Sequence, residues 1–200
     1  MATVAEAVAA LRAGLLVVLP TDTVYGLVAS AHSEKPARKL AGAKGRDARQ
    51  PIALVAADLE LLVDCVPELR GRGEAIARVL LPGPYTLVFP NPARRYPWLT
   101  GSRPETIGVR VPGLAGPARE VLDELGSFAA TSANLTGGPD PRTLAEVPPE
   151  IRAAAAALVD GGELGGAPST VLDFTGPEPR VLRDGAAPGA DALRAVASVL

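Results

Sequence analysis

The sequence predicts an α/β protein, α+β in some classifications, in which helices flank a twisted mixed β-sheet. Apolar runs of strand length alternate with segments of helical periodicity along the whole chain. Clusters of Thr, Ser, Asn, Lys and Arg adjoin several of these runs, as in PTDTVYGL and TSANLTGG. Because domains commonly hold roughly 100–150 residues, the 200 residues are expected to form one domain over 1–200.

Capping residues and apolar periodicity indicate the elements in order. Thr3 and Glu6 form a capping box for a first helix that Gly14 ends, and Asp58 is expected to cap another helix. The predicted helices cover 36–43, 59–63, 70–80, 117–125, 151–157 and 191–200. The predicted strands cover 15–19, 24–29, 52–56, 85–89, 106–111, 127–131, 158–160, 170–174 and 180–182.

One long connection carries two interpretations. The stretch 91–104 is rich in Pro and Arg and contains Trp98. A mobile surface loop or lid is one interpretation, and an ordinary connection between elements is the other.

Composition excludes several classes of protein. The chain has 20 basic and 22 acidic residues, which argues against a wholly basic nucleic-acid-binding surface but leaves a local positive cleft possible. Cys65 is the only cysteine, so an internal disulfide and a cysteine metal cluster are excluded, and we expect a small core residue. No apolar run approaches the roughly 18 residues of a membrane span, which predicts a soluble cytoplasmic protein with no membrane partner.

Several familiar catalytic motifs are missing from the sequence. It contains no GxxxxGK[ST], GxGxxG, GxSxG or HExxH pattern. His32 is the only histidine and lies in a predicted loop, so we expect it to be solvated and not a catalytic base.

The remaining polar clusters suit anionic ligands. Lys44, Arg46 and Arg49 lie between a predicted helix and strand, where they either bind a polyphosphate or form a solvated basic loop. TSANLTGG offers hydroxyls, an amide and backbone N–H groups to an anion, although turns also favour these residues. Arg110 lies in an apolar strand and must therefore pair with an acid or a ligand anion, and Arg183 poses the same question.

PTDTVYGL connects two predicted strands. Thr21 and Thr23 would face one way and Asp22 the other if this segment is extended. The alternative is a β-turn in which these side chains only satisfy backbone groups.

Together these motifs resemble the YrdC/TsaC family, the L-threonylcarbamoyladenylate synthases. They are PTDTVYGL, KxR followed by Pro51, TIGVRVP, TSAN, PST and LRDG, in the family's order, over about residues 14–186. The resemblance implies the YrdC-like fold, a twisted mixed sheet with helices around a concave positive cleft. It is closest to the short single-domain form of the family.

The resemblance also implies a reaction and its partners. The enzyme, a nucleotidyltransferase, would convert L-threonine, bicarbonate or CO2, and ATP to threonylcarbamoyl-AMP and pyrophosphate, with Mg²⁺. A transferase complex would use the product to modify tRNA, and weak direct binding of tRNA or double-stranded RNA is compatible with the sequence. Two alternatives are a nonsynthetic paralogue of the same fold and an RNA-binding module, against which the lack of an aromatic stacking array argues.

The family's binding residues fall on specific positions of this sequence. Lys44 and Arg46 would hold the ATP phosphates and support catalysis; the remaining nucleotide contacts would come from Ser132, Asn134 and Arg183, and the L-threonine contacts from Thr23, Arg110 and Ser169. Arg110 would bind the threonine carboxylate, while no metal ligand is assigned. Asp47, Val55 and Asp184 differ from the residues that are common at these positions in the family.

Overall fold

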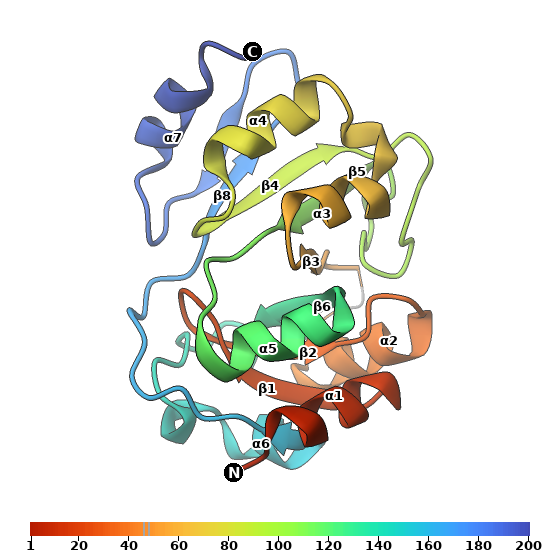
Figure 1. Ribbon diagram of the computed structural model, residues 1–200, viewed down its shortest axis with the longest axis vertical. Helices are drawn as coiled ribbons and strands as arrows, with labels where there is room; N and C mark the ends of the chain where they lie inside the picture. The colour runs from red at the N-terminus through yellow and green to blue at the C-terminus, as the bar shows by residue number, and fades with distance from the viewer. Residues whose placement is uncertain (46, 48) are drawn as a thin grey trace.

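The computed structural model describes residues 1–45, 47 and 49–200. Within these residues nine strands form one mixed sheet in the order β7-β1-β2-β6-β3-β5-β4-β8-β9, which confirms the predicted fold class (Figure 1). The strands are β1 (Leu16–Pro20), β2 (Tyr25–Ala29), β3 (Ala53–Ala56), β4 (Tyr85–Pro90), β5 (Thr106–Arg110), β6 (Ser127–Ser132), β7 (Ala155–Leu158), β8 (Thr170–Asp173) and β9 (Arg180–Arg183). That residues 1–200 make a single domain stays a prediction.

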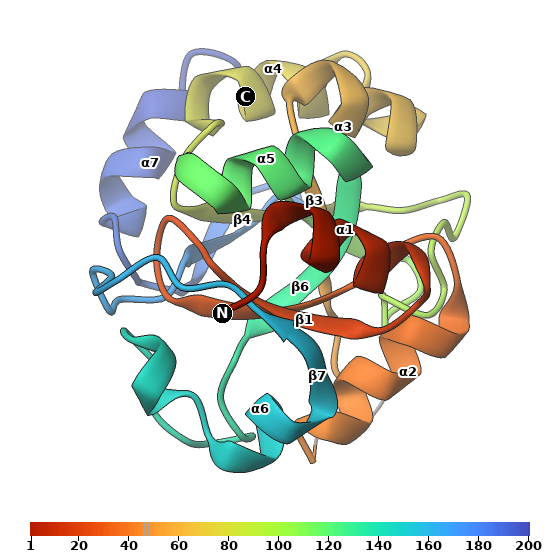
Figure 2. The ribbon, with the colours of Figure 1, turned by 60° about the horizontal axis from the view of Figure 1, so that its bottom comes forward.

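Helices cover the two faces of this sheet unequally. The larger apolar cluster packs one face against α2 (Glu34–Ala43), α3 (Leu59–Cys65), α4 (Arg72–Leu80), α6 (Pro149–Ala154) and α7 (Gly189–Val196). The smaller cluster packs the other face against α1 (Val4–Arg12) and α5 (Gly116–Leu125), which lie side by side in Figure 2. Short 3₁₀ turns cover Pro67–Leu69 and Leu144–Glu146. The described strand residues of this smaller cluster come from β1, β2, β3, β6 and β7, so the cluster covers only part of the second face.

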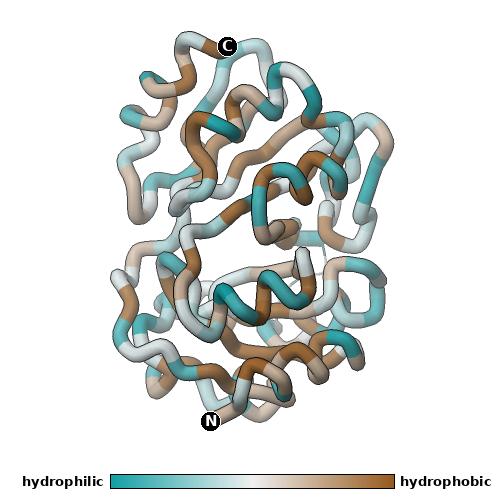
Figure 3. Tube along the Cα trace, in the orientation of Figure 1, coloured by the Kyte–Doolittle hydropathy of each residue, from teal (hydrophilic) through white to brown (hydrophobic). Residues whose placement is uncertain are grey.

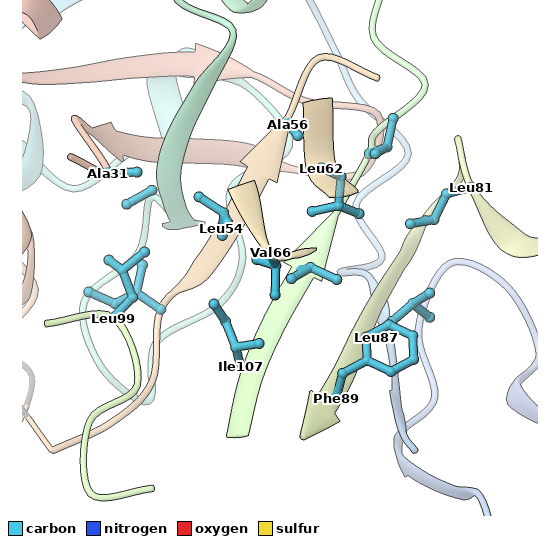
Figure 4. Packing of buried hydrophobic residues seen from close by; sticks show 14 of the residues in the cluster. Ala31, Leu54, Ala56, Leu62, Val66, Leu81, Leu87, Phe89, Leu99 and Ile107 are labelled. Carbon is cyan, nitrogen blue, oxygen red and sulfur yellow. The ribbon is translucent and has the colours of Figure 1, made fainter. Parts of the chain in front are cut away.

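Strand alternation assigns side chains to the two faces. Leu54 belongs to the larger cluster and the next residue, Val55, to the smaller one. Figure 4 shows Leu62 and Val66 packing over the strands that carry Leu54 and Ile107. The helices are correspondingly two-sided, and brown and teal segments alternate along α4 and α5 in Figure 3.

The predicted caps are present, and the end of one predicted helix is wrong. Thr3 and Glu6 form the capping box of α1, and the Asp58 side chain accepts from the Leu61 N–H at the start of α3. The alanine-rich run 151–157 was expected to be helical, but α6 ends at Ala154 and β7 begins at Ala155. Parallel pairing with β1, in which Leu16 lies opposite Ala155, outweighs the helix propensity of alanine here.

The connection 91–104 is held at many points, as an ordinary connection would be. The Trp98 indole N–H donates to the Ala31 carbonyl at 2.8 Å, and Leu99 is 1% exposed within the larger cluster. Asn91 is fully buried and donates to the carbonyls of Arg95 and Pro104. These contacts favour the second of the two interpretations of this stretch.

His32 is exposed, as expected. Cys65, which was expected in the core, is a partly buried free thiol packed against the edge of the larger cluster. No helix in the described part of the chain combines the length and apolar character that crossing a membrane requires.

Candidate active site

A cavity of about 290 Å³ lies on the sheet face that α1 and α5 cover only in part. Its floor consists of small residues on four neighbouring strands, Gly26, Ala130, Ala53 and Gly108. Ala53 and Ala130 lie directly opposite each other in the sheet. A floor without large side chains leaves room for a ligand to lie against the backbone.

Strand periodicity explains where the cavity begins. Val55 and Phe128 lie on the same face as Ala53 and Ala130, two residues along the same strands, and they pack into the cluster beneath α1 and α5. At Ala53 and Ala130 the side chains are only methyl groups, and α1 and α5 do not cover this part of the face. The sequence therefore builds core and cavity side by side on one surface of the sheet.

The cavity wall is positively charged. Among the described lining residues the charged ones are Arg103, Arg110 and Arg183. Arginine stays protonated at physiological pH and presents a planar fork of donors that matches carboxylates and phosphates. The wall is therefore suited to an anionic ligand, in agreement with the positive cleft expected from the family resemblance.

Arg110 is the most constrained of these cations. Its Nη2 donates to Asp22 Oδ1 at 2.8 Å, and the two side chains are 12% and 10% exposed. Asp22 Oδ2 also accepts from the Gly113 N–H, which fixes the carboxylate. Burial lowers the pKa of Arg110, Asp22 opposes this effect, and the nearby charge of Arg183 lowers the pKa further. Of the two pairing partners that the sequence left open, the structure shows an acid.

One donor of Arg110 has no protein acceptor. Among the described residues, the Arg110 Nε is the buried side-chain nitrogen for which no hydrogen-bond partner is present. Leaving a buried donor unpaired costs about 1–3 kcal/mol, so its persistence at a cavity wall points to a ligand that accepts from it.

The loop PTDT has features of both interpretations, the ligand-facing segment and the turn that satisfies backbone groups. Thr21 Oγ1 lies 3.0 Å from Thr23 Oγ1 and donates to the Val24 carbonyl at 2.6 Å. Thr21 thus satisfies backbone groups, as in a turn, while both threonines line the cavity. The Asp22 side chain accepts from Arg110, and bends at 22–24 replace the extended segment on which the expected opposition between Asp22 and the threonines depended.

Ser169 joins Arg183 and a residue from β4. Its Oγ lies 2.9 Å from Thr86 Oγ1, and Arg183 donates from Nη2 to the Ser169 carbonyl at 2.7 Å and to its Oγ at 3.2 Å. Arg183 therefore lies beside Ser169 and near Arg110, at the end of the cavity where Thr23 also lies.

Lys44 supports the TSAN loop. Its ammonium, in a residue that is 4% exposed, donates to the backbone carbonyls of Ser132 and Asn134 and to Asn134 Oδ1. The Asn134 side chain also accepts from Ser132 Oγ at 2.7 Å and donates to the Gly138 carbonyl at 2.6 Å. Lys44 and Asn134 thereby fix the loop that brings Ser132 to the cavity wall.

The structure brings most of the predicted site residues to one region. Thr23, Arg110, Ser132, Ser169 and Arg183 line the cavity, and Lys44 and Asn134 hold its wall. Arg46 lies outside the described residues, so its predicted contact with phosphate stays a prediction.

Sequence reasoning missed Thr86, Thr106 and Arg103 on the wall and did not identify Asp22 as the partner of Arg110. Thr86 and Val88 lie two residues apart on the same face of β4, and both line the cavity. Thr86 is a polar residue within this otherwise apolar strand. The polar residue within an apolar strand was visible in the sequence. The pairing of Asp22 with Arg110 was not, because it joins residues that are 88 positions apart.

Comparison with known proteins identifies relatives over most of the chain. The family model Sua5_yciO_yrdC, described as telomere recombination, matches residues 9–185. The threonylcarbamoyl-AMP synthase of Pyrococcus abyssi is 37% identical over 184 residues, which are 89% of this chain and 52% of that protein. The protein of the same name from Bacillus subtilis is 34% identical over 184 residues, 91% of this chain and 53% of that protein. The chain thus spans about half the length of these two relatives.

A solved structure of a relative agrees with the fold. Pyrococcus abyssi Sua5 complexed with L-threonine superimposes with a TM-score of 0.85 at 33% identity, over 97% of this chain and 57% of that chain. The similarity of the backbone therefore extends over nearly all of this chain.

Proposed function

The chain belongs to the Sua5/YciO/YrdC family, and from that premise we propose that it is an L-threonylcarbamoyladenylate synthase. The observation that carries the proposal is the buried Arg110, fixed by Asp22 at the cavity wall with an unpaired Nε. Such a group suits the carboxylate of an amino acid, which accepts hydrogen bonds from arginine at two oxygens. A relative of this fold was crystallised with L-threonine, which supports threonine as that amino acid.

The proposed reaction has two bond-forming steps. Bicarbonate supplies CO2 and releases hydroxide, which balances the proton lost when the threonine amine attacks the carbon to form a carbamate. A carbamate oxygen then attacks the α-phosphorus of ATP. The bond from that phosphorus to the bridging oxygen breaks, and its electron pair leaves with pyrophosphate.

Positioning and charge neutralisation are the contributions we assign to the protein. Thr23, Arg110 and Ser169 are proposed to hold threonine, with Arg110 on its carboxylate. Ser132, Asn134 and Arg183 are proposed to hold the nucleotide, and Lys44 and Arg46 the phosphates. Fixed cations stabilise the charge that develops on the phosphates, and alignment of the carbamate with the α-phosphorus lowers the barrier without a side-chain nucleophile.

Mg²⁺ is proposed to enter with ATP. The described residues contain no cluster of three His, Cys, Asp or Glu side chains suited to a metal ion, and the charged residues on the described wall are arginines. Because Mg²⁺ commonly binds through substrate phosphates and retains several waters, this residue set fits an ion carried by the triphosphate. The bound ion would supply charge neutralisation at the phosphates.

The wider setting follows from the product. Threonylcarbamoyl-AMP is a mixed anhydride, which we propose is consumed by a transferase complex that modifies tRNA in the cytoplasm. Direct binding of tRNA or double-stranded RNA by this chain is at most weak in this proposal, since its net charge is −2.

Pyrophosphate release tests the proposal. The protein is incubated with ATP, Mg²⁺ and bicarbonate, with L-threonine present, omitted, or replaced by L-serine or L-valine. We expect release that requires both bicarbonate and L-threonine and falls with either substitute. Release indifferent to threonine, or no release with every substrate present, would contradict the synthase and favour a nonsynthetic paralogue; salt-dependent RNA binding without turnover would favour the RNA-binding module.

A further inference from the structure

The backbone around Arg103 is fixed on both sides. The Arg103 N–H donates to the Thr100 carbonyl at 3.1 Å, and the Arg103 carbonyl accepts from the Thr106 N–H at 3.0 Å and from Thr106 Oγ1 at 3.1 Å. Thr100 and Thr106 are 1% and 8% exposed, so both anchors are buried. The next carbonyl, that of Pro104, accepts from the buried Asn91 side chain. The point from which the Arg103 side chain extends is therefore rigid.

The same loop is joined to the segment that follows Lys44. The Ile52 N–H donates to the Leu99 carbonyl at 2.7 Å, and the Ser102 N–H donates to the Arg49 carbonyl at 2.8 Å. Gly101 lies so close to Arg49 that a Cβ on Gly101 would come within 2.1 Å of the Arg49 carbonyl oxygen. Arg103 is thus held in a fixed relation to Arg49 and Ile52.

The head group of Arg103, in contrast, is only weakly engaged. Its side chain lines the cavity and is 48% exposed, and its ion pair with Glu105 has an N–O distance of 4.0 Å. An exposed pair at this distance contributes little, roughly 0–1 kcal/mol. The Arg103 backbone is therefore fixed, while its guanidinium can leave Glu105 and bind a more highly charged anion.

Arg103 and Arg110 lie at opposite ends of the cavity. Arg103 precedes β5 and Arg110 ends it, and the strand alone separates Thr106 from Arg110 by about 13 Å at roughly 3.3 Å per residue. Pro51 and Ile52, which follow the KxR segment, line the cavity as Arg103 does. The described cations of the wall thus divide into Arg110 with Arg183 at one end and Arg103 at the other.

We propose that Arg103 binds the β- and γ-phosphates of the nucleotide and the pyrophosphate that leaves, an inference that rests on the proposed function. If the threonine carboxylate lies at Arg110, the carbamate and the α-phosphorus must be near that end. The remaining phosphates then extend along β5 toward Arg103. A guanidinium at that end neutralises the charge that builds up on pyrophosphate as it departs.

Binding measurements with three phosphate ligands test this role. Calorimetry of the full chain measures the affinities for ATP, pyrophosphate and AMP in the wild type, Arg103→Gln and Arg94→Gln. Arg94 is an exposed arginine of the same loop that does not line the cavity, so its replacement controls for the loss of one positive charge. We expect Arg103→Gln to weaken ATP and pyrophosphate about tenfold and to change AMP less than twofold, with Arg94→Gln unchanged.

The outcomes separate this inference from the proposed function. Equal losses for ATP and AMP, or no loss for either, would overturn the assignment of Arg103 while leaving the synthase standing. Equal weakening by Arg94→Gln would mean that the effect is one of overall charge, which also overturns it. A wild type that binds neither ATP nor pyrophosphate would overturn the proposed function and, with it, the role of Arg103.

Discussion

Arg110 and Lys44 are two buried cations at the same cavity, and their surroundings differ. Arg110 pairs with a buried carboxylate and keeps its Nε without a protein acceptor. Lys44 donates to three oxygens of the TSAN loop, two backbone carbonyls and one side-chain amide. An ammonium has three donors, so these contacts occupy all of them. Arg110 thus retains capacity for a ligand, whereas Lys44 uses its capacity to shape the wall.

The difference shows how two positions of family motifs can serve one site in different ways. Arg110 can donate from its Nε to a ligand and still keep its ion pair with Asp22. A cation held by carbonyl oxygens would have to give up one of those bonds to contact a phosphate directly, leaving a buried carbonyl without a donor. We therefore expect Arg110 to act mainly on ligand binding. Lys44 stabilises the loop, and its proposed contact with the phosphates requires it to give up one of these bonds.

Replacing Arg110 should change both stability and ligand binding more than any other substitution considered below. Arg110→Met leaves Asp22 buried without its counter-charge, so the free energy of unfolding should fall by about 4 kcal/mol in urea titrations. L-Threonine binding, measured by calorimetry, should be lost. Arg38→Met removes an exposed i,i+4 pair with Glu34 and should cost less than about 1 kcal/mol.

A second substitution at Arg110 distinguishes loss of threonine binding from loss of folding. Arg110→Lys keeps the charge next to Asp22 but loses the planar fork, and it should weaken L-threonine binding about tenfold or more while remaining folded. Unchanged threonine affinity in Arg110→Lys and Arg110→Met would remove Arg110 from the threonine site.

Replacing Lys44 should affect stability first. Lys44→Met deprives the carbonyls of Ser132 and Asn134 and the Asn134 amide of a charged donor, and we expect a loss of about 3 kcal/mol in the free energy of unfolding. Lys39→Met is the matched control, because the Lys39 ammonium donates to one exposed carbonyl, that of Gly14. A Lys44→Met protein as stable as the wild type but weak in ATP binding would show that Lys44 acts on the phosphate directly.

Much of the fold was predictable because it follows local rules. The capping box of Thr3 and Glu6, the Asp58 cap and the alternation along β3 and β5 are properties of short segments. The error at 151–157 has a long-range cause, because Ala155 pairs in the sheet with Leu16 of β1. Parallel pairing over such a separation leaves no local signal.

The site was predictable in composition and less so in geometry. Sequence reasoning required a partner for Arg110 but left acid and ligand open, and the fold supplies Asp22 from a distant loop. The arginines on the described part of the wall show the same limit, because Arg103 is on an irregular connection whose path depends on the buried Asn91 and Leu99. Residue type indicates the chemistry, and tertiary contacts decide which group faces the ligand.

Asp173 of β8 is another buried charge, and its replacement should have a smaller effect than that of Arg110 or Lys44. Its side chain is 1% exposed, and it accepts from the N–H and hydroxyl of Thr175 and from Arg180. Burial raises the pKa of Asp173, but these hydrogen bonds outweigh it and hold the pKa below the ordinary value of 3.8. The charge is satisfied, as that of Lys44 is, but away from the cavity.

The sign of its pH dependence follows from that lowered pKa. The stabilisation is fully present above the unfolded pKa of about 4 and is lost as the pH falls through the lower pKa of the folded state. Asp173→Asn should therefore reduce the free energy of unfolding by about 1 kcal/mol at pH 7, with the difference from the wild type shrinking in acid. Asp123→Asn, at an exposed pair with Arg119, should change stability less, and neither variant should alter L-threonine or ATP binding. A loss of ligand affinity in Asp173→Asn would mean that a satisfied buried charge outside the cavity also governs the site, and the distinction drawn from Arg110 and Lys44 would fail.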